Sequence, residues 1–201
     1  MGKLYVVGLT GPTGAGKTTV SRLLAQKGFR VIDADLVARQ AVMPETTCLA
    51  EITRAFGEAV INADGSLDRR ALGGIVFGNR DKLSLLEGIL FPSIIHEIER
   101  QLQQCEREGK RLVILDAPTL FESGADALCD SVLVVTAPKN ARLTRIMLRD
   151  NLSCEQALQR VAAQKDDAFY LSRANYVVDN GAGQPDYPAL LDWLKRVGGA
   201  T

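Results

Sequence analysis

The chain has 201 residues, of which 46% are hydrophobic, so it can bury one sizeable core but is short for two full domains. Its 24 basic residues balance its 24 acidic residues, which argues against a general nucleic-acid-binding protein, since that class needs a basic excess. No stretch approaches the roughly 18 consecutive apolar residues of a membrane helix, so we expect no membrane attachment.

The cysteines favour neither a zinc site nor a disulfide framework. Cys48, Cys105, Cys129 and Cys154 form no Cys-x-x-Cys pair, and the single histidine, His96, has no cysteine nearby in sequence. A reducing compartment suits such a protein, so we expect a cytoplasmic location. Only a short apolar run precedes the first glycine-rich motif, and we expect no signal peptide.

The N-terminal half begins with a strand, a helix and a second strand. Apolar runs predict strands at Leu4–Leu9 and Arg30–Asp33, and the spacing of apolar residues predicts a helix over Lys17–Lys27. Residues 36–108 are predicted to be mainly helical, with one turn at Asn62–Gly65. This stretch is too long for a plain crossover between strands, so we expect an inserted helical piece.

The C-terminal half returns to alternating strands and helices. Strands are predicted at Leu112–Leu115, Val132–Val135 and Tyr176–Val178, and helices at Lys139–Asp150, after the capping-box residue Ser153, and at Leu190–Val197. Strands that alternate with helices indicate an α/β fold in which a parallel sheet carries helices on both faces.

One motif carries most of the functional information. Residues 11–18 read Gly-Pro-Thr-Gly-Ala-Gly-Lys-Thr, which matches the phosphate-binding loop pattern G-x-x-x-x-G-K-[ST] at every fixed position. Backbone N–H groups of such a loop point at phosphate oxygens, the lysine reaches the β- and γ-phosphates of ATP, and the Thr18 hydroxyl can bind Mg²⁺. The predicted ATP-binding residues here are Gly11, Thr13, Gly14, Ala15, Gly16, Lys17, Thr18 and Thr19.

Acidic residues follow two of the predicted strands. Asp33 and Asp35 come after the second strand, where open parallel sheets bind ligands, and a carboxylate there can orient an alcohol and take its proton. The alternative is a helix N-cap and a solvated loop acid. Asp116 ends the third strand, where a carboxylate can hold Mg²⁺, and its alternative is a surface acid.

Three arginines lie in the helix predicted after the fourth strand: Arg142, Arg145 and Arg149. Arg145 and Arg149 are four residues apart and share a helix face, so they could fold over a triphosphate. The alternative is that each arginine lies on a solvated basic face of the helix, which the spacing alone favours over a contact with the triphosphate.

Together, these residues and several further blocks resemble the dephospho-coenzyme A kinase family, nearly end to end. The matching blocks are Gly8–Thr19, Asp33-Ala34-Asp35 with Arg39, Leu67-Asp68-Arg69, Val76-Phe77, Pro118 to Glu122, Arg145 to Asp150 with Gln164, and Ala174–Asn180. The chain differs from the family in having Phe91-Pro92 where the family commonly has His-Pro, and Thr119 where it has leucine.

The resemblance implies a P-loop kinase fold: a five-stranded parallel sheet flanked by helices, with a helical substrate-binding insertion and a lid. It predicts one domain over residues 1–201, with a core of 1–35, 111–138 and 174–201, an insertion of 36–110 and a lid of 139–173.

The resemblance also implies ATP and Mg²⁺ as co-substrate and metal, dephospho-coenzyme A as acceptor, and a monomer or small homo-oligomer. It assigns Asp35 as the base, Arg145 as a contact to the transferred phosphate, and Asn180 and Arg149 to the nucleotide site. Asp33, Asp35, Arg39 and Arg69 are the predicted substrate-binding residues, and Thr18 and Asp116 the metal ligands.

Two other classes compete with this interpretation. Another P-loop small-molecule kinase, acting on a nucleoside monophosphate or a sugar, would share the phosphate-binding loop. A GTPase switch would need a guanine-reading Asn-Lys-x-Asp and an Asp-x-x-Gly after the third strand. The chain has neither, because Asp116 is followed by Ala117, Pro118 and Thr119.

Overall fold

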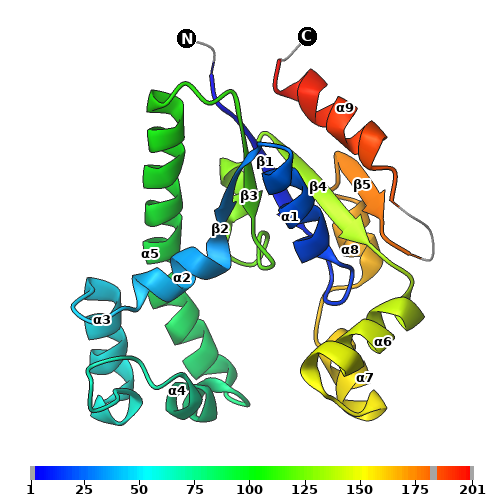
Figure 1. Ribbon diagram of the computed structural model, residues 1–201. Helices are drawn as coiled ribbons and strands as arrows, with labels where there is room; N and C mark the ends of the chain where they lie inside the picture. The colour runs from blue at the N-terminus through cyan, green and yellow to red at the C-terminus, as the bar shows by residue number, and fades with distance from the viewer. Residues whose placement is uncertain (1–2, 182–184, 200–201) are drawn as a thin grey trace. The chain divides into compact units, whose positions relative to one another are not determined.

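The structure is a computed structural model that describes residues 3–181 and 185–199 (Figure 1). The chain divides into two compact units. The first comprises Met1–Ile32 and Gln104–Thr201, and the second comprises Asp33–Gln103.

The sheet is five-stranded and parallel, as predicted. In chain order its strands are β1 (Tyr5–Thr10), β2 (Arg30–Asp33), β3 (Leu112–Asp116), β4 (Ser131–Thr136) and β5 (Tyr176–Asp179). Their spatial order is β2-β3-β1-β4-β5, so β1 lies in the centre between β3 and β4. Central strands of a parallel sheet are covered on both faces, which explains why β1, β3 and β4 are continuous apolar runs.

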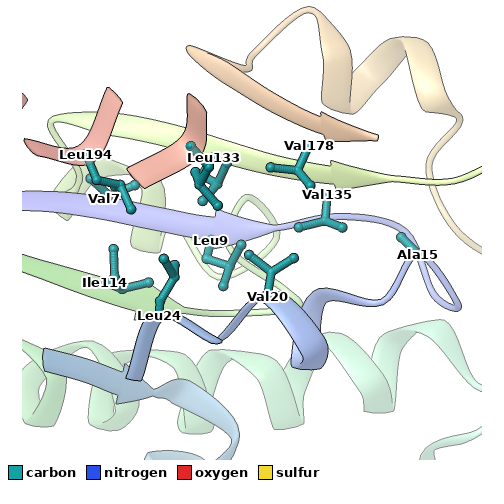
Figure 2. Packing of buried hydrophobic residues seen from close by; sticks show 11 residues of the cluster. Val7, Leu9, Ala15, Val20, Leu24, Ile114, Leu133, Val135, Val178 and Leu194 are labelled. Carbon is teal, nitrogen blue, oxygen red and sulfur yellow. The ribbon is translucent and has the colours of Figure 1, made fainter. Parts of the chain in front are cut away.

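Two helices cover one face of this sheet and form the main core with it. Val20 and Leu24 of α1 (Lys17–Gln26) and Leu194 of α9 (Tyr187–Val197) pack against strand residues such as Leu9 and Leu133 (Figure 2). All of these side chains are fully buried. The core therefore anchors the start of α1, and with it the loop that joins β1 to α1.

Three helices occupy the segment between β4 and β5: α6 (Lys139–Asp150), α7 (Cys154–Ala162) and α8 (Asp167–Leu171). The predicted capping box opens α7, because the Ser153 hydroxyl accepts from the Gln156 N–H at 3.2 Å and the Gln156 side chain accepts from the Ser153 N–H at 2.9 Å. α6 packs against α7, and α8 packs against β4.

The second unit is helical and has its own core. It contains α2 (Ala34–Ala41), α3 (Thr47–Phe56), the 3₁₀ helix η1 (Glu58–Val60), α4 (Arg69–Val76) and most of α5 (Arg80–Arg107). Side chains of Asp33, Thr46 and Asp68 cap α2, α3 and α4. A cluster that includes Ile52, Val60, Leu72 and Val76 fills the interior. In the part of the chain that the structure describes, no helix has the length and apolar character needed to cross a membrane.

Candidate active site

The predicted phosphate-binding loop joins β1 to α1, and its glycines are required by geometry. Gly14 and Gly16 have φ angles of 78° and 95°, in the left-handed region that side chains disfavour. A Cβ on Gly11 would lie 2.2 Å from the Val135 carbonyl oxygen, and one on Gly16 would lie 2.0 Å from the Asn180 side-chain nitrogen. The loop can therefore curl against neighbouring segments only with glycine at these positions.

The helix after the loop supplies positive charge. α1 begins at Lys17, so its N-terminal end, which includes Thr18 and Thr19, adjoins the loop and attracts anions. The Lys17 ammonium forms an ion pair with the carboxylate of Asp116, and the two side chains are 15% and 9% exposed. Both charges are thus held beside the loop with little solvent around them.

Strand register explains why Asp116 lies there. Asp116 is the last residue of β3 and pairs with Leu9 of β1, two residues before the loop begins at Gly11. Oxygen ligands such as the Asp116 carboxylate and the Thr18 hydroxyl are those that Mg²⁺ prefers. Among the described residues no group of three or more His, Cys, Asp or Glu side chains could hold a metal ion. One carboxylate suffices for Mg²⁺ that is bound together with nucleotide phosphates, so the donor set fits that ion.

Arg145 of α6 contacts the backbone of the loop. Its guanidinium donates to the carbonyls of Gly14 and Ala15, each at 3.2 Å, and to the Asn180 carbonyl at 2.7 Å. The Asn180 side chain in turn donates to the Ala15 carbonyl at 2.8 Å. Arg145 and Asn180, which the sequence predicted as site residues, therefore lie together against the phosphate-binding loop.

The two neighbouring arginines of α6 have different surroundings. Arg142 is only 4% exposed and pairs with Asp167 of α8 at 3.0 Å, so the expectation of a solvated face is wrong for this residue. Its Nε atom is buried without a hydrogen-bond partner among the described residues. Arg149 is exposed and pairs with Asp150, which also pairs with Arg160. The hydrogen bonds that Arg149 donates to the Asp150 carboxylate raise the pKa of Arg149 above its ordinary value.

Sequence reasoning did not include Gln164 in the site, although the structure places it at the loop. The Gln164 side-chain oxygen accepts a hydrogen bond from the Thr13 N–H at 2.7 Å. A phosphate oxygen accepts hydrogen bonds from the same kind of donor. The signal available was the place of Gln164 in the family's lid block, but spacing alone does not connect residues 151 positions apart.

The remaining predicted residues belong to the helical unit. Asp33 caps α2, because its Oδ1 accepts from the N–H groups of Asp35 and Leu36 at 2.9 and 3.2 Å. This is the N-cap role that the sequence left as an alternative. Asp35 lies exposed in the first turn of α2 and Arg39 in its last turn, and Arg69 is the first residue of α4. These residues therefore lie at both ends of α2 and at the start of α4.

Comparison with known proteins gives consistent matches along the chain. The family model described as dephospho-CoA kinase matches residues 5–186. A dephospho-CoA kinase of Bacillus licheniformis is 39% identical over 189 residues, which cover 94% of each chain.

Solved structures similar to this chain support the same family. TT1252 from Thermus thermophilus superposes with a TM-score of 0.82 at 34% identity and covers 96% of this chain and 99% of its own. Dephospho-CoA kinase from Campylobacter jejuni superposes with a TM-score of 0.72 at 30% identity, and the match covers 98% of both chains. With the phosphate-binding loop, the sheet order and the helical insertion all in place, the chain belongs to the dephospho-CoA kinase family.

Proposed function

We propose that this protein transfers the γ-phosphate of ATP to the ribose 3′-hydroxyl of dephospho-coenzyme A, giving coenzyme A and ADP, the last step of coenzyme A biosynthesis. The observation that carries the proposal is the phosphate-binding loop with the Lys17 ammonium beside it and the Arg145 guanidinium hydrogen-bonded to its backbone. Two cations at one loop suit phosphoryl transfer, where negative charge spreads over the transferred group. The acceptor follows from the family to which the chain belongs.

In this reaction the ribose 3′-oxygen forms a bond to the γ-phosphorus while the bond from that phosphorus to the β,γ-bridging oxygen breaks. Lys17 binds the β- and γ-phosphates, and Arg145 turns from the loop carbonyls towards the transferred group. Asp35 accepts the proton of the 3′-hydroxyl, as the family resemblance assigns. Asp33, Arg39 and Arg69 bind the acceptor, while the other loop residues, Arg149 and Asn180 bind ATP.

Asp116 and Thr18 would hold Mg²⁺, which neutralises charge on the β- and γ-phosphates when it is bound. The Lys17–Asp116 ion pair supports this role, because it holds the Asp116 carboxylate beside the loop. Nucleotide phosphates would then draw Lys17 away from Asp116 and free the carboxylate for the metal.

We further propose that the enzyme works in the cytoplasm as a monomer or small homo-oligomer, without nucleic-acid or membrane partners. The four cysteines are free, which suits a reducing compartment. Light scattering on the purified protein measures its oligomeric state.

The direct test incubates the protein with ATP, Mg²⁺ and dephospho-coenzyme A and detects coenzyme A by mass spectrometry. A second set of reactions offers nucleoside monophosphates and sugars as acceptors, because another P-loop small-molecule kinase would prefer these. Formation of coenzyme A as the preferred product supports the proposal. If a known dephospho-CoA kinase is active in the same buffer and this protein forms no coenzyme A, the proposal is wrong.

A further inference from the structure

The Gln164 side chain occupies a hydrogen-bond donor of the phosphate-binding loop. Its Oε1 atom accepts from the Thr13 N–H at 2.7 Å, at the short end of the usual range for such bonds. Thr13 is the third residue of the loop motif, and the N–H groups of such a loop receive phosphate oxygens. A carboxamide of the protein itself thus lies where a nucleotide phosphate would compete for the same donor.

Two other side chains that contact the loop bind its carbonyl groups. Arg145 donates to the carbonyls of Gly14 and Ala15, each at 3.2 Å, and Asn180 donates to the Ala15 carbonyl at 2.8 Å. These contacts do not use the N–H groups that a phosphate needs. Gln164 instead accepts from a loop N–H, so its effect on nucleotide binding should be opposite to that of the two carbonyl ligands.

Gln164 can leave this position without a change of fold. It is an exposed residue in the turn between α7, which ends at Ala162, and α8, which begins at Asp167. Both helices are held by other contacts, since the Ser153 capping box opens α7 and α8 packs against β4. Rotation about the side-chain torsions of Gln164 is therefore enough to release the Thr13 N–H.

A phosphate is the stronger of the two competitors for this donor. Hydrogen bonds to ionised acceptors are roughly twice as strong as those to neutral ones, and the carboxamide is neutral. The Lys17 ammonium and the N-terminal end of α1 also attract an anion, and the carboxamide gains little from this attraction. Gln164 should therefore weaken nucleotide binding without blocking it.

From these relationships we propose that Gln164 is an intramolecular competitor of ATP. Its carboxamide holds the Thr13 N–H until a phosphate oxygen of ATP takes that donor and releases the side chain. The competition weakens ATP binding by the net free energy of the internal hydrogen bond, which corresponds to about fivefold in a dissociation constant. The inference rests on the proposed function only in that ATP binds at this loop.

Isothermal titration calorimetry with ATP and Mg²⁺ on three variants tests this inference. Gln164→Met keeps the length of the side chain and removes the amide acceptor. Gln164→Glu keeps the acceptor and adds a negative charge, which binds the N–H more strongly and repels phosphate. Gln159→Met makes the same change as the first variant at an exposed residue of α7 and is the matched control.

We expect Gln164→Met to bind ATP about fivefold more tightly than the wild-type protein does. Gln164→Glu should bind ATP at least tenfold more weakly, and Gln159→Met should match the wild type. The Thr13 amide proton should exchange faster with solvent in Gln164→Met, since it has lost its acceptor. All three substitutions are at exposed residues, so the variants should fold normally, and melting temperatures check this.

Two results would overturn the inference. Weaker ATP binding by Gln164→Met than by the wild type would make Gln164 a direct ligand of the nucleotide. Unchanged ATP affinity, or unchanged exchange of the Thr13 amide proton, would show that the side chain does not compete. The titration contains no acceptor, so a protein that binds ATP but never phosphorylates dephospho-coenzyme A would overturn the proposed function and leave this test intact.

Discussion

The ammonium of Lys17 and the carboxylate of Asp116 form an ion pair although 99 residues separate them, and both groups are largely buried. Each charge is therefore the main compensation for the other in a partly desolvated place. This relationship makes Lys17 important for folding as well as for phosphate binding, because removing one member of a buried pair leaves the other uncompensated.

The first prediction concerns Lys17→Met. We expect kcat to fall on the order of 10³-fold, because the charge aimed at the β- and γ-phosphates is lost. The free energy of unfolding should fall by about 3 kcal/mol, since Asp116 stays buried without its partner. The double variant Lys17→Met/Asp116→Asn should recover most of the stability and none of the activity, as urea titration and a coupled assay would measure. Equal stability of the single and double variants would contradict the pairing.

Gly16→Ala tests the packing of the loop against Asn180. The new methyl group would displace the Asn180 amide and break its hydrogen bond to the Ala15 carbonyl. Gly28→Ala is the matched control, because Gly28 has a similar φ of 88° with no atom within 4 Å of an added Cβ. We expect Gly28→Ala to cost about 1 kcal/mol from backbone strain alone and Gly16→Ala to cost more and also to weaken ATP binding. Calorimetry on both variants measures the difference in stability. An equal loss of stability in the two variants would argue against a close contact between Gly16 and Asn180.

Arg145→Ala should slow the chemical step more than it weakens ATP binding. If Arg145 meets the transferred phosphate mainly in the transition state, its loss lowers kcat, and nucleotide affinity falls less because the Asn180 side chain still holds the Ala15 carbonyl. Single-turnover rates and ATP dissociation constants, measured separately, decide this. Arg160→Ala removes an exposed arginine that pairs with Asp150 and serves as the control. A fall in affinity alone would make Arg145 a binding residue.

The ion pair between the buried Arg142 and the half-exposed Asp167 gives an asymmetric prediction. Asp167→Ala leaves the Arg142 cation buried without its carboxylate, which should lower the free energy of unfolding by about 2 kcal/mol, less than for a fully buried pair because solvent reaches Asp167. Arg142→Met removes the charge and keeps an apolar chain of similar length, so we expect a smaller loss. Urea unfolding measures the free energy of unfolding of both variants. A larger loss of stability in Arg142→Met than in Asp167→Ala would contradict this prediction.

Of Asp33 and Asp35 at the start of α2, we expect Asp35 to be the residue that governs acceptor activation. Asp35→Asn keeps the shape but removes the basicity, and should lose about 10²- to 10⁴-fold in kcat, with a smaller change in acceptor affinity. Asparagine is also a good N-cap, so Asp33→Asn should preserve α2. Asp33 ends β2 at the ligand-binding edge of the sheet, where its carboxylate can contact Mg²⁺ through water as well as the acceptor, so Asp33→Asn should raise the Mg²⁺ concentration needed for half-maximal rate. Steady-state rates at several Mg²⁺ concentrations separate the two roles. Loss of turnover in Asp33→Asn at saturating Mg²⁺, with near-normal Asp35→Asn, would reverse them.

Much of the architecture was predictable from the sequence because it depends on local signals. Apolar runs marked all five strands, and Pro138 before a polar-apolar pattern placed α6 at the residues where it occurs, Lys139–Asp150. The phosphate-binding loop was predictable for the same reason, since its glycines, lysine and threonine all fall within residues 11–18.

The pairings within the site were not predictable in this way. The buried Arg142 pairs with Asp167, which lies 25 residues later on another helix, and the hydrogen bond from Thr13 to Gln164 joins residues 151 apart. Helical spacing describes only the face on which a side chain lies. What covers that face is decided by chain topology and packing, which a single sequence does not reveal.

The hydrogen bonds that Arg145 and Asn180 donate to the phosphate-binding loop also fix the direction in which a loop N–H group points. In a trans peptide the carbonyl and the following N–H point in opposite directions, so a carbonyl held outward directs the next N–H inward. Arg145 and Asn180 together hold the Ala15 carbonyl, and the N–H of Gly16 is thereby directed into the loop. The amide dipole is thus oriented by hydrogen bonds within the protein. Substitutions at the end of β5 would thus alter phosphate affinity without touching the phosphate.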